Sequence, residues 1–285
     1  MSTSPAASAA PAAQAGESAE RERILSLRGI TKTFGAVHAL NGIDLDVHAG
    51  EVVAVVGDNG AGKSTLIKTL AGVNPPTSGT ILFHGDPVHI PDPAAAISLG
   101  IATVFQDLAL CENLDVVQNL FLNRELGPLR LDETQMEIRS WTLLRELSAR
   151  IPSVRLPVAA LSGGQRQTVA IARCLLGEPR VILLDEPTAA LGVAQTAEVL
   201  DLIERLRARG LGVIMISHNM ADVQAVADRV VVLRLGRNNG EFDARTATSE
   251  QLVAAITGAH DNAVARRSAR RAEPAQNPVE EGTDD

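Results

Sequence analysis

Residues 57–65 have the sequence Gly57-Asp58-Asn59-Gly60-Ala61-Gly62-Lys63-Ser64-Thr65, which fits the pattern of a glycine, four residues and then Gly-Lys-Ser/Thr. A glycine-rich turn that leads into a helix directs several backbone N–H groups, together with the positive end of the helix, at one region of space. The pattern therefore predicts a loop that binds the phosphates of a nucleotide. We expect Lys63 to contact the terminal phosphates and the Ser64 hydroxyl to ligate Mg²⁺.

The residues on either side of this phosphate loop (residues 57–65) support the prediction. The preceding run, Glu51 to Val56, is almost wholly apolar, which is typical of a strand buried on both faces of a parallel sheet. The following run, Leu66 to Leu70, has the spacing of a helix. The alternative interpretation is an ordinary tight turn between a strand and a helix, and this context favours phosphate binding over it.

The composition narrows the classes of function. A chain of 285 residues with 45% hydrophobic residues is long enough for one large domain or two small ones with a real core. Its formal net charge of −8 provides no basic surface field of the kind that attracts nucleic acid. Aromatic residues make up only 2% and tyrosine is absent, so a function that requires an aromatic ring depends on a few Phe, Trp or His side chains.

The two ends of the chain differ in composition from the middle. Residues 1–21 are rich in Ala, Ser and Pro and lack the basic start and Leu-rich segment of a signal peptide. Residues 261–285 combine paired arginines with acidic residues and few large apolar side chains. We predict two disordered tails around a domain that spans residues 22–260. Contact of the C-terminal arginines with acidic lipid is the less favoured alternative.

Cysteine content and hydropathy indicate a cytosolic chain without a membrane span. Cys111 and Cys174 are far apart and lack the spacing of metal ligands, so we expect reduced thiols that serve as packing residues. No run of the sequence reaches the roughly 18 apolar residues that a membrane-spanning helix needs.

The segment before the phosphate loop predicts antiparallel strands. Apolar residues alternate with polar ones around Ile24–Leu27 and Ile43–Val47, which is the pattern of half-buried strands. Phe34 lies between them in a polar stretch beside Gly35. Its ring could stack on an adenine or be buried in the core, and this stretch alone does not decide between the two.

After the phosphate loop, further strands and helices alternate. Thr80–Phe83 predicts a short strand, and Asp92 followed by Pro93 marks the start of a helix that ends near Gly100. Ile101–Phe105 predicts another strand, which ends at Gln106. A lone glutamine after a strand is usually a loop residue.

Residues 112–178 lack strand signals and predict a helical insertion. Trp141, Leu144, Leu147 and Ile151 recur at helical spacing, so Trp141 is expected in the core. Near the end of the insertion, Ser162 and Gln165 have the spacing of a capping box at the start of a helix. The plain interpretation is a capped helix. The functional one adds that Gly163 and Gly164 leave the first amides of that helix accessible to an anion.

The last strands end in residues suited to phosphate chemistry. Val181–Leu184 predicts a buried strand followed by Asp185 and Glu186, and Gly212–Ser217 predicts another that ends at His218. Ligands of α/β sheets bind at the carboxyl ends of parallel strands, where one carboxylate can ligate Mg²⁺ and the next can orient a water molecule. The alternatives are an acidic pair at a helix start and a histidine in a turn.

In this order, the motifs resemble those of the ATP-binding cassette (ABC) family, the motor subunits of ABC transporters. The phosphate loop, Gln106, Leu161–Gln167, Val181–Glu186 and His218 match the Walker A, Q-loop, signature, Walker B and switch-histidine motifs of that family. The resemblance runs from about residue 24 to 258. It implies an α/β fold with a phosphate-loop NTPase core, a mostly parallel sheet, an N-terminal antiparallel β-subdomain and an inserted α-helical subdomain.

A narrower resemblance points to the ATPases of bacterial monosaccharide importers. It is carried by Gln106-Asp107-Leu108-Ala109-Leu110, with Asn113-Leu114 and Val117-Gln118-Asn119-Leu120.

The resemblance implies a role for each motif residue. Phe34 is then the aromatic that stacks on adenine, and Ser64, Gln106 and Asp185 arrange Mg²⁺ and its water molecules. Glu186 positions or activates the attacking water, and His218 holds the γ-phosphate. The residues implied to contact ATP are Phe34, Gly57, Asp58, Asn59, Gly60, Ala61, Gly62, Lys63, Ser64, Thr65, Gln106, Ser162, Gly163, Gly164, Gln165 and Asp185.

The resemblance also implies partners. Ser162–Gln165 would complete the ATP site of a second copy of the chain, so that two ATP molecules are sandwiched in a homodimer. Transmembrane permease subunits would hold the dimer at the cytoplasmic face of the membrane and link it indirectly to an extracytoplasmic solute-binding protein. No nucleic acid partner is implied. One departure concerns Gly192, because family members commonly have Ser-Ala-Leu-Asp where this chain has Ala189-Ala190-Leu191-Gly192.

Three other functions compete with sugar import. An ABC exporter or lipid-handling cassette has the same motifs. A soluble cassette ATPase that acts on ribosomes or DNA usually has two cassettes in one chain, and the acidic charge here does not favour it. A small-molecule kinase built on the same loop lacks the signature and the helical insertion.

Overall fold

The computed structural model describes residues 21–127 and 131–259, so the two predicted tails, apart from Arg21, lie outside the described residues. The strands are β1 Arg23–Phe34, β2 Val37–His48, β3 Val52–Val56, β4 Ser78–Phe83, β5 Asp86–Val88, β6 Ile101–Val104, β7 Val181–Asp185, β8 Gly212–Ile216, β9 Arg229–Arg234 and β10 Arg237–Asp243. The helices are α1 Lys63–Leu70, α2 Pro93–Ser98, α3 Val116–Phe121, α4 Glu133–Glu146, the 3₁₀ helix η1 Val158–Ala160, α5 Gly163–Leu175, α6 Val193–Ala208, α7 Met220–Val226 and α8 Ser249–Thr257.

The main sheet is mostly parallel, as predicted. Its strand order is β10-β9-β3-β8-β7-β6, and only the pairing of β10 with β9 is antiparallel among the described strands. All of β3 is buried, and its residues alternate between two cores. Val52, Ala54 and Val56 face the cluster that contains the helical segment, whereas Val53 and Val55 face the cluster below the antiparallel sheet. The phosphate loop therefore follows a strand that is packed on both faces.

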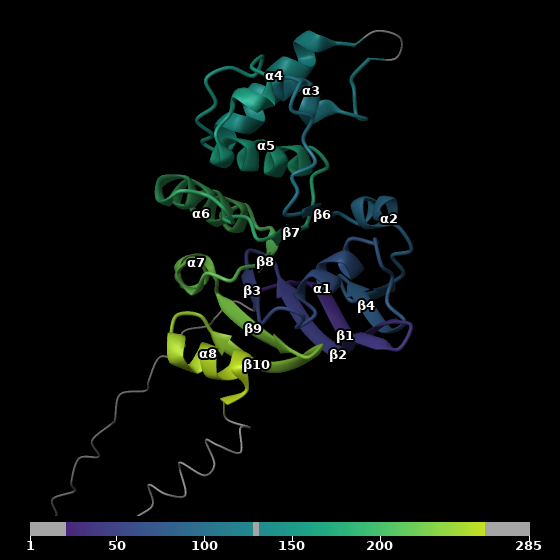
Figure 1. Cartoon of the computed structure of the whole chain (residues 1–285). Coiled ribbons are helices and arrows are strands. Elements are labelled where there is room, and N and C mark those ends of the chain that lie inside the picture. The colour runs from purple at the N-terminus through teal and green to yellow at the C-terminus, as the bar shows by residue number, and fades with distance from the viewer. Residues whose placement is uncertain (1–20, 128–130, 260–285) are drawn as a thin grey trace, which may run out of the picture.

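The second sheet is antiparallel and covers one face of the main sheet. Its strand order is β2-β1-β4-β5, and β1 pairs with β2 through Leu25↔Val47 and Leu27↔Leu45. Their inward side chains share a core with α1, the helix after the phosphate loop. Figure 1 shows β1, β2 and β4 beside α1. This confirms the predicted N-terminal β-subdomain.

Residues 112–178 contribute α3, α4, η1 and α5 and, in their described part, no strand; a bridge pairs Asp115 with Pro157. α3 and α4 lie at the end of the molecule opposite α8, and α5 lies between them and α6 (Figure 1). Trp141 is partly buried against the larger core, with the Arg145 guanidinium 5.8 Å from its ring centroid. It packs at the edge of the core and not in its centre.

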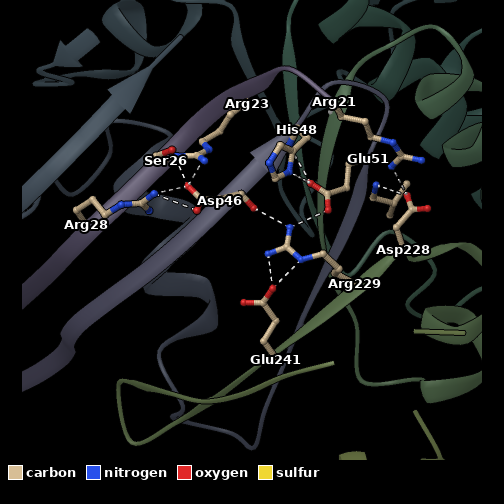
Figure 2. Close-up of polar contacts among 11 residues, drawn as sticks. Arg21, Arg23, Ser26, Arg28, Asp46, His48, Glu51, Asp228, Arg229 and Glu241 are labelled. Atoms are coloured by element: carbon tan, nitrogen blue, oxygen red, sulfur yellow. Dashed lines mark hydrogen bonds and ion pairs between the residues drawn. The ribbon is translucent and has the colours of Figure 1, made fainter. Parts of the chain in front are cut away.

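A charged network joins the two sheets at the end of β3 away from the phosphate loop (Figure 2). The buried carboxylate of Glu51 accepts hydrogen bonds from the backbone N–H of His48 at 2.8 Å and from the Arg229 guanidinium at 2.7 Å. Arg229 also pairs with Glu241 on β10 and donates to the backbone oxygen of Asp46 on β2. Since these residues come from both sheets, the network fixes β2 against β9.

Within the described residues, no helix combines the length and the apolar character that a membrane crossing requires.

Candidate nucleotide-binding site

The phosphate loop connects the end of β3 to the start of α1, as predicted. Gly57 has φ 155° and Gly62 has φ 104°. A Cβ atom on Gly57 would lie 2.2 Å from the Leu233 carbonyl oxygen, and one on Gly62 would lie 2.7 Å from that of Ala39. These close approaches leave room only for glycine. The loop is thus held tightly against β9 and β2 while its outer side remains open to a ligand.

Lys63 is pre-positioned inside the loop. Its side chain is 6% exposed, and Nζ donates to the carbonyl oxygens of Gly57 at 2.8 Å and Asp58 at 2.9 Å. Burial lowers the pKa of Lys63, and the charges of Glu186, Asp58 and Asp185 act in the opposite direction. A phosphate is a stronger acceptor for an ammonium group than a neutral carbonyl. Lys63 can therefore exchange its loop contacts for contacts with a nucleotide.

Asp185 and Glu186 lie where β7 ends, near the phosphate loop. Burial raises the pKa of Asp185, and so does the neighbouring charge of Glu186, while Lys68, Lys63 and His218 act against this shift. The structure therefore brings the predicted residues from three strand ends into one electrostatic cluster. Ser64 is exposed in the first turn of α1, where its hydroxyl is accessible.

Glu186 is paired with His218. His218 Nε2 lies 2.8 Å from Glu186 Oε1, and the Glu186 N–H donates to the Ile216 carbonyl oxygen at 3.1 Å. Glu186 has φ 51°, in the left-handed region that residues other than glycine seldom adopt. Such strain persists where surrounding contacts fix the backbone, and it is common at functional sites. The turn after β7 thus directs this carboxylate toward the end of β8.

Gln106 follows β6 and is exposed. It lines a cavity of about 410 Å³ together with Glu186 and Gly163. This cavity connects the end of the main sheet with the start of α5.

The signature segment (Leu161–Gln167) forms the predicted capping box at the start of α5. Ser162 Oγ accepts from the Gln165 N–H at 3.3 Å, and Gln165 Oε1 accepts from the Ser162 N–H at 2.9 Å. The two glycines also have a packing role that the sequence did not indicate. A Cβ atom on Gly163 would lie 2.7 Å from Leu191 Cδ2, and one on Gly164 would lie 3.2 Å from Gln195 Cβ.

Phe34 lies at the end of β1 with 45% of its surface exposed, so it is not a core residue. The Lys32 ammonium is 5.2 Å from its ring centroid. The exposed ring remains accessible to a flat partner.

Gly192 is the residue before α6, and a Cβ atom there would meet nothing within 4 Å. An aspartate would fit, and nothing in the structure explains its absence.

Thr188 and Asp222 were not predicted from the sequence as part of the site. Thr188 Oγ1 donates to Asp222 Oδ2 at 2.6 Å, which connects the turn after Glu186 to α7. No local pattern in the sequence indicates this contact, because Thr188 and Asp222 are 34 residues apart.

The residues present fit Mg²⁺ only together with a nucleotide. Across residues 21–127 and 131–259, no group of three or more His, Cys, Asp and Glu side chains forms a metal site by itself. Mg²⁺ is usually held in proteins by one or two carboxylates, water and substrate phosphates. The Asp185 carboxylate and the accessible Ser64 hydroxyl beside a phosphate loop are consistent with that arrangement.

The fold and this site define a nucleotide-binding domain of the phosphate-loop class. Residues 40–189 match the family described as ABC transporter. The chain belongs to this family.

Known proteins with similar sequence or structure carry related names. The chain is 46% identical over 215 residues to the xylose/arabinose import ATP-binding protein of Sulfolobus acidocaldarius, and the aligned residues make up 75% of this chain and 86% of that relative. It is 42% identical over 250 residues to the fructose import ATP-binding protein of Rhizobium meliloti, and the aligned residues make up 85% of this chain and 96% of that relative. A solved dimeric ATP-binding cassette in a post-hydrolysis state with ADP and Pi is similar with a TM-score of 0.66 and 26% identity, covering 79% of this chain and 100% of that one.

Proposed function

We propose that this chain is the ATP-hydrolysing subunit of an ABC transporter that imports a simple sugar. The observation that carries the ATPase part is the pairing of Glu186 with His218 at 2.8 Å beside a phosphate loop whose lysine is already buried in place. The cargo part is supported by relatives named for the import of xylose, arabinose and fructose.

Each site residue has a role in this proposal. Lys63 and the loop amides bind the phosphates, and Phe34 stacks on adenine. Asp185, Ser64 and Gln106 would hold Mg²⁺ with its water molecules, and the ion would neutralise charge on the phosphate oxygens. Glu186 accepts a proton from the attacking water, and His218 orients this carboxylate and contacts the γ-phosphate. Catalysis then depends on positioning and charge and needs no covalent intermediate on the protein.

The functional unit that we propose is a homodimer. The sequence contains one phosphate loop and one signature segment. In the dimer, Ser162–Gln165 of each copy would face the ATP bound to the other copy, with the amides at the start of α5 directed at the phosphates. The existence of a similar cassette as a dimer with ADP and Pi supports this arrangement.

The proposed location is the cytoplasmic face of a membrane, through contact with permease subunits. ATP binding would close the dimer and hydrolysis would open it, and the permease would convert this motion into transport. An extracytoplasmic solute-binding protein would take part indirectly, by delivering the sugar to the permease.

Purification from membranes tests the proposal. The tagged chain should be recovered with a permease, and ATP hydrolysis by the complex should rise when the solute-binding protein loaded with xylose, arabinose, ribose or fructose is added. Phosphate should be released without a phosphorylated sugar, which separates an ATPase from a kinase. Recovery without a membrane partner, together with sugar-independent hydrolysis, would favour a soluble cassette instead. Stimulation by a lipid in place of a sugar would favour an exporter.

A further inference from the structure

Asp222 on α7 contacts the turn that carries Glu186. Its Oδ2 accepts a hydrogen bond of 2.6 Å from the Thr188 hydroxyl, two residues after Glu186 in the sequence. Its Oδ1 accepts one of 2.9 Å from the Asn219 side-chain amide, one residue after His218. A single carboxylate therefore binds both segments from which the Glu186–His218 pair is built.

The carboxylate is buried and fully engaged. Asp222 is 5% exposed, and each of its oxygens has a side-chain donor. The Asn219 side chain is itself fixed, because its Oδ1 accepts from the Ala221 N–H at 3.0 Å at the start of α7. A buried charged acceptor strengthens such hydrogen bonds and makes their loss costly. Asp222 thus forms a stiff link between the turn after β7 and the start of α7, because it binds Thr188, which lies 34 residues earlier in the sequence.

The turn needs such a link because its backbone is strained. Glu186 and Ala190 both have positive φ, at 51° and 58°, on either side of Thr188. Strained backbone relaxes unless contacts outside the turn hold it. The Glu186 N–H bond to Ile216 holds one side of the turn, and the Thr188 hydroxyl holds the other.

We infer that Asp222 is a positioning residue for ATP hydrolysis, which acts through Thr188 to hold the Glu186 carboxylate in place against His218. This inference rests on the proposed function. Asp222 touches neither Glu186 nor the phosphate loop among the described contacts, so it would affect turnover and not nucleotide binding. A displacement of about 1 Å at a reacting group can reduce the rate by about 10²-fold.

Substitutions at Thr188 test the inference with little disturbance of packing. Thr188→Val removes the hydroxyl and keeps the shape, and Thr188→Ser keeps the hydroxyl. We expect Thr188→Val to lower kcat for ATP hydrolysis by about 10- to 100-fold. The KM for ATP should change by less than about 3-fold, because the binding residues are on other elements. Thr188→Ser should keep wild-type kcat, and Thr142→Val, at an exposed threonine of α4, serves as the matched control.

A double-mutant cycle identifies Asp222 as the partner. Asp222→Ala should lower kcat as Thr188→Val does, and the double variant should be no slower than the slower single variant, since both remove the same contact. If Asp222→Ala does not fold, the comparison of Thr188→Val with Thr188→Ser still decides whether the hydroxyl matters.

The inference is overturned if Thr188→Val and Thr188→Ser have equal kcat, or if the KM of Thr188→Val for ATP rises while its kcat falls. It is also overturned if the kcat losses of Thr188→Val and Asp222→Ala multiply in the double variant. Glu186→Gln is measured in parallel. Normal turnover in that variant would reject the proposed role of Glu186 itself, whereas a slow Glu186→Gln beside a normal Thr188→Val would reject only the role of Asp222.

Discussion

The imidazole of His218 and the carboxylate of Glu186 face each other at 2.8 Å, from the ends of the neighbouring strands β8 and β7. The pair lies in the same electrostatic cluster as Lys63 of the phosphate loop. A carboxylate held by an imidazole and directed toward a phosphate site is placed to take a proton from water.

The first prediction concerns Glu186→Gln. Glutamine keeps the size and a hydrogen bond to His218 but is not a base. ATP binding should be retained, and kcat should fall by roughly 10²- to 10⁴-fold. Nucleotide titration and single-turnover hydrolysis measure the two effects separately. Glu204→Gln, at an exposed position of α6, is the control and should behave as wild type. Near-normal turnover of Glu186→Gln would remove Glu186 from the reaction.

The second prediction concerns self-association. Because the signature segment begins a helix whose first amides suit an anion, two copies should bind each other through ATP. The Glu186→Gln variant, which cannot clear its nucleotide, should be a dimer with ATP and a monomer without it, as measured by light scattering after size exclusion. Gly163→Ala should abolish this dimer. A profile that remains monomeric with ATP would indicate a different partner chain.

The phosphate loop could be predicted from sequence because its determinants are local. Gly57 and Gly62 are required by close backbone approaches, and a glycine pattern records such a requirement directly. The strand before it and the strand ends at Asp185 and His218 were equally predictable, because buried parallel strands are continuous apolar runs.

The remaining features depend on tertiary contacts. β10 was not predicted, since Arg237–Asp243 is polar and becomes a strand by pairing with the apolar β9. The packing of Gly163 against Leu191 and the contact of Thr188 with Asp222 join segments that are distant in sequence. Neither leaves a periodic pattern that a single sequence could reveal.

The third prediction concerns Phe34. Stacking of a base on an aromatic ring contributes about 1–3 kcal/mol, so Phe34→Ala should weaken ATP binding by roughly 5- to 150-fold. Phe34→Tyr should retain affinity, because its ring has a similar face. Binding of inorganic triphosphate, which has no base, should be unchanged in both variants. Equal loss of ATP and triphosphate binding would show that Phe34 supports the loop instead of the base.

The fourth prediction concerns the charged network between the sheets. Glu51 has a side chain that is 4% exposed and pairs with Arg229, whereas Glu241 pairs with the same arginine but is 57% exposed. Removing one partner of a buried pair costs about 3–5 kcal/mol, so Glu51→Ala should lower the free energy of unfolding by about that amount. Glu241→Ala should cost no more than about 1 kcal/mol. Urea denaturation measures the free energy of unfolding of both variants. Similar losses in the two variants would show that the buried Glu51–Arg229 pair contributes no more to stability than the exposed Glu241–Arg229 pair of the same network (Figure 2).

The fifth prediction concerns Cys174, whose Sγ donates to the Thr103 carbonyl oxygen at 3.5 Å. Burial raises the pKa of this thiol to about 11, although the positive charges of Arg173 and Arg124 act to lower it. Only the thiolate reacts, and a pKa of about 11 leaves on the order of 0.1% thiolate at pH 8. Alkylation of native Cys174 should therefore be at least about 100-fold slower than that of an ordinary thiol. The rate should rise about tenfold per pH unit up to pH 10. The Cys111→Ser variant isolates this thiol, and the same variant in urea supplies the unburied reference. A rate that levels off near pH 8.5 in the folded protein would show that the thiol of Cys174, which is partly buried on α5, is not shielded by packing against the core.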